Sequence, residues 1–162
     1  MTDFNDIKGR KPLKEQLSKL IAKGRISHGY IFEGPSGSGK KLIADAFSEL
    51  LFCSNPDKLN PCGICEGCTG YKEKYILKSD KAITVEEIRS LVADTQLMPL
   101  NNRSKVYIIY NADTMTDQAQ NAFLKTLEEP PPYAFFILTV TNSEQMIDTI
   151  RSRCITLYTG VN

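Results

Sequence analysis

The sequence has almost no net charge. Lysine and arginine together number 20 and aspartate and glutamate 19, which leaves a formal charge of +1 at neutral pH. This balance excludes the strong overall basic field that drives non-specific nucleic-acid binding. We therefore expect direct DNA binding by this chain to be weak, because little counterion release is available to it.

The chain also has no segment that would place it in a membrane. No apolar run approaches the ~18 residues that a membrane span requires, and residues 1–10 lack the apolar stretch of a signal peptide. Internal repeats and low-complexity segments are absent. With 162 residues, 41% of them hydrophobic and 24% charged, the sequence has the composition of one globular domain. We expect it to be cytoplasmic.

Helical and strand patterns alternate along the chain. Continuous apolar or β-branched runs predict strands at 29–32, 75–77, 106–110, 135–140 and 154–158. Amphipathic spacing and capping signals predict helices at 12–23, 42–51, 84–92, 116–127 and 143–150. Five strands separated by helices are typical of a doubly wound parallel α/β sheet with helices on both faces.

A glycine-rich segment follows the first predicted strand and precedes a helix. Gly34-Pro-Ser-Gly-Ser-Gly-Lys40 matches the first seven positions of the P-loop pattern in the required strand–loop–helix context. Backbone N–H groups of such a loop surround a phosphate, and the lysine supplies a positive charge. The candidate nucleotide-binding residues are Gly34, Pro35, Gly37, Ser38, Gly39, Lys40 and Lys41. The alternative is a glycine turn that binds no ligand.

Two departures remove the metal machinery of a P-loop ATPase. The eighth position should be the Ser or Thr that ligates Mg²⁺, and here it is Lys41. The strand that should end in acids ends in Tyr110-Asn111. Asp113 lies past the strand end, so we do not expect it to substitute. The chain should not hydrolyse ATP efficiently, and any ATP or ADP should bind weakly or without Mg²⁺.

Four of the five cysteines lie within one irregular segment. Cys53, Cys62, Cys65 and Cys68 include two Cys-x2-Cys pairs, the spacing of a structural tetrahedral metal site. In a reducing compartment we expect Zn²⁺ there, in a small module at 53–68. Free thiols and an iron–sulfur cluster are the alternatives. Cys154 stands alone in a strand pattern and is expected to be a buried small hydrophobe.

Several motifs together resemble a known family. Residues 116–131, TDQAQNAFLKTLEEPP, are similar to the helix signature of bacterial DNA polymerase III clamp-loader subunits, which are AAA+ proteins. His28-Gly-Tyr-Ile-Phe before the glycine-rich segment, the cysteine insertion and Ser152-Arg153-Cys154 also fit. The resemblance runs from about residue 5 to 158. One departure is a short segment between Cys68 and the helix cap at Thr84, which lacks an expected His-Pro-Asp-like stretch.

The resemblance carries expectations about architecture and partners. It implies one AAA+ core domain over 1–162 with the zinc module inside it, and sheet order 5-1-4-3-2. The lid and collar domains of the family would lie outside this chain, so alone it should be monomeric. The implied partners are the gamma/tau and delta subunits of the loader and, through the complex, the sliding clamp and primed DNA.

The resemblance also assigns roles to two residues. Arg153 would be an arginine finger that reaches a neighbouring subunit's ATP, and Thr141 would be a polar sensor of the γ-phosphate. The alternative for Arg153 is a solvated arginine at a strand edge. Without a metal ligand or acidic strand end, the chain is more similar to the non-catalytic delta-prime type of subunit. The alternatives are an ATP-hydrolysing gamma/tau-like motor and a zinc-ribbon DNA-binding module. The second is disfavoured because Glu66 is the only charge between Cys62 and Cys68, and Lys72, Lys74 and Lys78 just beyond fit a solvated face better.

Overall fold

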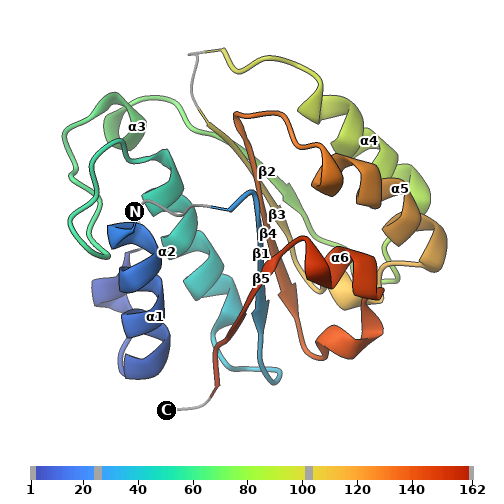
Figure 1. Cartoon of the computed structure of the whole chain (residues 1–162), viewed down its shortest axis with the longest axis horizontal. Coiled ribbons are helices and arrows are strands. Elements are labelled where there is room, and N and C mark those ends of the chain that lie inside the picture. Colours follow the sequence, from blue (N-terminus) through green and yellow to red (C-terminus); the bar gives the residue numbers. More distant parts are fainter. Residues whose placement is uncertain (1–2, 24–26, 101–103, 161–162) are drawn as a thin grey trace.

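Five parallel strands form a single sheet at the centre of the molecule (Figure 1). The computed structural model describes residues 3–23, 27–100 and 104–160. The sheet has the order β2-β3-β4-β1-β5, which confirms the predicted fold. Its strands are β1 (Gly29–Glu33), β2 (Glu73–Leu77), β3 (Lys105–Ile109), β4 (Ala134–Val140) and β5 (Ile155–Tyr158).

Helices cover both faces of the sheet. In Figure 1, α1 and α2 lie on one side and α4, α5 and α6 on the other. The helices are α1 (Lys11–Ala22), α2 (Lys40–Phe52), α3 (Glu66–Thr69), α4 (Val85–Thr95), α5 (Asp117–Glu128) and α6 (Asp148–Ser152), with 3-10 turns η1 (Phe4–Asp6), η2 (Ala112–Thr114) and η3 (Ser143–Gln145). Within the described residues no helix has the length and apolarity that crossing a membrane requires.

Two hydrophobic cores form because successive strand side chains point to opposite faces. Tyr30 and Phe32 of β1 pack with α1 and α2, whereas Ile31 between them packs with α4, α5 and α6. The same alternation runs along β3, where Ile108 faces the first core and Tyr107 the second. The central strands are buried on both faces, which explains their continuous apolar sequences.

The helix expected at 143–150 is instead a turn, η3, followed by α6. Met146 and Ile147 between them are extended, with ψ values of 144° and 148°. The cause is a tertiary contact, since the Ile147 N–H donates to Oε1 of the buried Gln120 on α5 at 2.7 Å. By contrast, Thr84 and Thr116 cap α4 and α5 as expected.

The strand register brings three loops together at one edge of the sheet. Glu33, the last residue of β1, pairs with Val140 of β4 and with Tyr158 of β5. The residues after these strands are therefore neighbours, and they include Gly34, Thr141 and Thr159. Ligands of open α/β sheets bind at the carboxyl ends of the strands, so the fold places the glycine-rich segment where such a ligand belongs.

Candidate functional site

The glycine-rich loop, residues 34–40, is held against the end of β5. A Cβ added to Gly34 would lie 2.0 Å from Oγ1 of Thr159, so this position has no room for a side chain. Gly37 and Gly39 have φ values of 79° and 82°, the left-handed region that glycine enters without strain. The local sequence therefore folds as the P-loop pattern predicted.

Lys40 points into its own loop. Its ammonium donates to the carbonyls of Gly34 at 2.5 Å and Pro35 at 3.2 Å, and lies 3.5 Å from Oγ1 of Thr141. The side chain is buried, and burial lowers the pKa of Lys40, an effect that the nearby Asp113 opposes. Lys40 and Thr141, both named from the sequence, thus lie together.

Lys41 and Tyr110 also meet. The Lys41 ammonium is 5.3 Å from the centroid of the Tyr110 ring, a cation–π distance. Burial raises the pKa of Tyr110, and Asp45, one helical turn after Lys41, raises it further. The following residue, Asn111, has a φ of 54°, and its N–H donates to Oγ1 of Thr139 at 3.0 Å.

Asp113, which the sequence placed past the strand end and which was not expected to substitute for the missing acids, lies at this edge of the sheet. Its carboxylate accepts the N–H groups of Thr141 and Asn142, both at 3.1 Å, and therefore ties η2 to the end of β4. Glu33 does the same from β1, accepting the Ser143 N–H and hydroxyl at 3.0 Å. Both carboxylates fasten backbone in this structure. Pairing over this sequence distance leaves no local motif.

Arg10 is a further residue at the loop that the sequence analysis missed. Its guanidinium donates to the carbonyl of Ser38 in the loop and, at 2.8 Å, to that of Thr159. A pocket of about 690 Å³ opens beside it, lined by Pro12, Leu13, Tyr158 and their neighbours. Arg10 precedes α1, and only the tertiary fold brings it to the loop.

The four clustered cysteines converge on one point. The sulfurs of Cys53, Cys62, Cys65 and Cys68 all lie within 4.8 Å of one another. Backbone N–H groups donate to these sulfurs, including Cys62 to Cys53 at 3.2 Å and Gly63 to Cys68 at 3.3 Å. The N–H of Ser54 helps lower the pKa of Cys65 to about 5. Four converging thiols with N–H support can hold a metal such as zinc.

The cluster is anchored to the end of α2. Cys53 follows Phe52 directly, and the short helix α3 carries Cys68. A Cβ on Gly67 would lie 1.7 Å from the Phe52 carbonyl oxygen, so only glycine allows this approach. Lys72 and Lys74, just beyond, form ion pairs with α2 at 3.0 Å to Glu49 and 2.8 Å to Asp45. These two lysines are therefore engaged within the fold.

Arg153 lies near the amino ends of the strands, whereas the glycine-rich loop lies at their carboxyl ends. It is the C-cap of α6, two residues before the start of β5, and its half-exposed side chain is 3.7 Å from Oε2 of Glu128. Cys154 is partly buried against the second core, close to the expected placement. Ser38, Gly39 and the other loop residues lie together, whereas Arg153 is separated from them by the length of β5.

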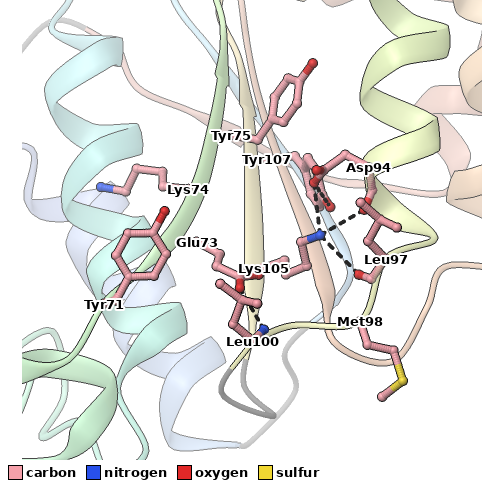
Figure 2. A pocket seen from close by; sticks show the side chains of 10 residues that line it. All are labelled: Tyr71, Glu73, Lys74, Tyr75, Asp94, Leu97, Met98, Leu100, Lys105 and Tyr107. Carbon is pink, nitrogen blue, oxygen red and sulfur yellow. Dashed lines mark hydrogen bonds and ion pairs between the residues drawn. The ribbon is translucent and has the colours of Figure 1, made fainter.

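A second pocket lies at the start of β2 and β3, away from the glycine-rich loop (Figure 2). Lys105 in it is buried, forms an ion pair with Asp94 at 3.0 Å and donates to the carbonyls of Asp94 and Leu97. The Tyr107 hydroxyl donates to the same Asp94 carboxylate at 2.7 Å. These contacts join the end of α4 to β3.

The chain is similar in sequence to known proteins. A sequence model of the family described as "DNA polymerase III, delta subunit" matches residues 9–159. The chain belongs to this family. DNA polymerase III subunit tau of Escherichia coli is 34% identical over 160 residues, covering 96% of this chain and 25% of that protein. Subunit gamma of Buchnera aphidicola is 32% identical over 157 residues, covering 94% and 42%.

Solved structures support the fold. A DNA polymerase III gamma subunit-related protein from Thermotoga maritima superposes with a TM-score of 0.64 at 23% identity, over 93% of this chain and 46% of that one. The RuvB Holliday junction branch migration motor of the same organism superposes with a TM-score of 0.64 at 15% identity, over 98% of this chain and 47% of that one. The chain spans about a quarter of the tau relative and has an AAA+-like fold.

Proposed function

We propose that this chain is a non-catalytic, delta-prime-like subunit of the DNA polymerase III clamp loader. The observation that carries the proposal is the contact of Lys41 with Tyr110, at 5.3 Å from ammonium to ring centroid. These residues stand at the two places that hold Mg²⁺ in P-loop ATPases. Neither side chain is a Mg²⁺ ligand of the required kind, and Asn111 beside Tyr110 is not a general base.

Arg153 would serve the ATP of a neighbouring subunit. It precedes β5, whereas Thr159, which follows β5, touches this chain's own glycine-rich loop. Four strand residues at ~3.3 Å each put the two ends more than ~13 Å apart, so Arg153 is poorly placed for its own loop. A guanidinium supplied in trans neutralises charge on the transferring phosphoryl group.

The partners follow from this role. They would be the gamma/tau and delta subunits, and through the assembled loader the sliding clamp and primed DNA, in the cytoplasm. The cluster formed by Cys53, Cys62, Cys65 and Cys68 would hold a structural Zn²⁺, since four thiolates leave no open coordination position for catalysis. ATP or ADP at the glycine-rich loop, with Thr141 beside it, would be retained rather than turned over.

A second candidate is an ATP-hydrolysing gamma/tau-like motor. The names of the relatives favour it, because proteins called tau are 34% identical over 160 residues. This candidate requires a Mg²⁺ site that Lys41 and Tyr110 do not provide. ATP turnover by the chain itself would establish it.

The decisive experiment measures hydrolysis at the neighbour's site in the assembled loader. With Arg153→Ala, we expect that site to slow by ~10³-fold or more, while Arg153→Lys restores little because a lysine lacks the planar fork. Arg89→Ala, an exposed arginine of α4, is the matched control. Unchanged hydrolysis with Arg153→Ala, or turnover by the isolated chain, would contradict the proposal.

A further inference from the structure

Positive charge is concentrated in one segment of this otherwise neutral chain. Residues 7–23 contain six lysines and arginines and a single acidic residue, Glu15, which gives the segment a net charge of +5. Because the whole chain carries +1, the rest of it carries a net charge of −4. The overall balance therefore hides a strongly basic stretch, which is helix α1 with the residues on either side of it.

Most lysines of this stretch are free to meet a ligand. Four of them are exposed and have no ion-pair partner in the part of the chain that the structure describes: Lys8, Lys11, Lys19 and Lys23. Lys14 is partly buried and donates to the Ile7 carbonyl, and Arg10 is engaged at the glycine-rich loop. By contrast, Lys74 and Lys105 elsewhere in the fold are ion-paired. The free lysines do not serve the folded structure as those two do.

A further exposed lysine, Lys58, reaches this surface from the cysteine module. It lines a shallow groove of about 620 Å³ together with three lysines of α1, and Glu15 is the only acidic residue in that lining. The Asn5 side-chain amide donates to Oδ1 of Asn60 at 3.3 Å, which ties the loop of Lys58 to the segment before α1. We call this surface, formed by Lys11, Lys14, Lys19 and Lys58 with Lys8 and Lys23 beside it, the basic groove.

The composition of the basic groove indicates a phosphate-bearing ligand. The large exposed hydrophobic side chains of the described residues lie elsewhere, and α1 carries none of them. A helix that lies on a membrane needs apolar side chains, and the centres of protein interfaces are poor in lysine and rich in aromatic residues. Lysines without an apolar anchor are instead typical of contacts to the nucleic-acid backbone.

The length of the basic groove fits the spacing of a duplex backbone. Lys11 and Lys19 are eight residues apart, which is ~12 Å along a helix axis. A DNA duplex rises ~3.4 Å for each phosphate of one strand, so this length corresponds to three or four successive phosphates. Contacts to phosphates position a protein on DNA but carry no sequence information.

We propose that the basic groove binds the phosphate backbone of duplex DNA without sequence preference. Lysine ammonium groups of α1, with Lys58 beside them, contact successive phosphates and displace condensed counterions. This contact belongs to the chain itself and lies on the opposite face of the sheet from α6 (Figure 1), whereas the proposed function brings DNA to the chain only through the assembled loader. The contact is weak, as expected from the net charge, because few lysines take part.

The test is fluorescence anisotropy of a labelled DNA duplex of arbitrary sequence, titrated with this chain in a series of salt concentrations. We expect binding at low salt that weakens steeply as salt rises. Four phosphate contacts at ~0.9 each should lower log K by about 3.6 for every tenfold increase in salt. A second duplex of different sequence and equal length should bind with the same affinity.

Matched variants assign the binding to the basic groove. One replaces Lys11 and Lys19 (Lys11→Gln with Lys19→Gln), and the control replaces two exposed lysines elsewhere (Lys78→Gln with Lys125→Gln). The first should weaken binding at low salt at least about tenfold and reduce the salt slope by ~2. The control should change affinity by less than about twofold. Lys11→Arg with Lys19→Arg should retain binding, because the contact requires only positive charge.

Equal affinities of the two glutamine variants would overturn the inference, as would absence of duplex binding at low salt. Binding of polyglutamate as tight as that of the duplex would overturn it too, because the groove would then recognise an acidic polypeptide. All of these measurements use this chain alone, whereas the role of Arg153 is measured as hydrolysis in the assembled loader. The failure of this inference and the failure of the proposed function are therefore distinguishable.

Discussion

The hydroxyl groups of Ser38 and Thr159 lie 3.2 Å apart and are both buried, although 121 residues separate them in the sequence. The Thr159 hydroxyl also donates to the Glu33 carbonyl at 3.1 Å. This pair joins the glycine-rich loop to the segment after β5, so the loop is supported from outside its own strand and helix.

Gly34→Ala should destabilise the protein through this contact. The added Cβ would overlap Oγ1 of Thr159, which is 2.0 Å away, and overpacking of this kind costs ~1–3 kcal/mol. Urea unfolding measures the loss. The comparison is Gly37→Ala, which meets no atom within 4 Å and should show only the ~1 kcal/mol cost of a positive φ. Equal losses for both variants would show that the Thr159 contact is not tight.

Removal of metal should destabilise the cysteine module and the end of α2. We expect the purified chain to carry one Zn²⁺, and a strong chelator to lower the melting temperature, because a structural metal contributes directly to folding. Metal analysis and thermal unfolding check both points. Cys65→Ser should lose the metal, whereas Cys154→Ser, outside the cluster, should retain it. An iron absorption band would identify a cluster in place of zinc.

Asp94→Asn, in the pocket of Figure 2, should lower the free energy of unfolding of the protein by ~2 kcal/mol. The change leaves the Lys105 ammonium, whose side chain is 8% exposed, without its charge partner, and buried charges that lose a partner are strongly destabilising. The cost is reduced because Asp94 itself is about one-third exposed. Chemical denaturation measures it. Asp80→Asn, at an exposed position, is the control and should change stability by less than ~0.5 kcal/mol.

Cys154 should resist alkylation in the folded protein. Burial raises the pKa of its thiol from 9.0 to about 12, so at pH 8 only about one molecule in 10⁴ carries the reactive thiolate. Labelling with iodoacetamide at pH 8, followed by mass spectrometry, checks this. Because the folded pKa is the higher one, folding keeps this proton, and its contribution to stability is lost as pH rises from about 9 to 12. Rapid labelling of native protein at pH 8 would contradict this burial.

The sequence predicted the strands well because their signals are local. Apolar runs such as 106–110 mark strands buried on both faces. Thr84 and Thr116 mark helix starts because each side chain accepts a hydrogen bond from the backbone N–H three residues later. The prediction of one helix at 143–150, after β4, was wrong because the conformation of this segment depends on Gln120 of α5. Local periodicity carries no information about that bond.

The candidate site divides in the same way. Residues 34–41 and the four cysteines were found because ligands of this kind need fixed spacings. Arg10, Glu33 and Thr159 were not identified, and Asp113 was considered only as a substitute acid, because each contacts this end of the sheet from a different element and through backbone atoms. The Lys41–Tyr110 contact was predicted in part. The sequence showed that both residues differ from the P-loop ATPase pattern, but only the fold shows that their side chains lie together.

Contacts at both ends of β5 fix the number of residues in this strand. It runs from Ile155 to Tyr158, with Arg153 two residues before it and Thr159, which contacts Ser38 of the glycine-rich loop, directly after it. Insertion or deletion of one residue would turn the side chains beyond that point to the opposite face of the sheet. The Thr159 hydroxyl would then leave Ser38, or Arg153 and Cys154 would leave their places beside Glu128 and Gly29. We therefore expect this strand to tolerate exchanges of side chain but no change in residue count.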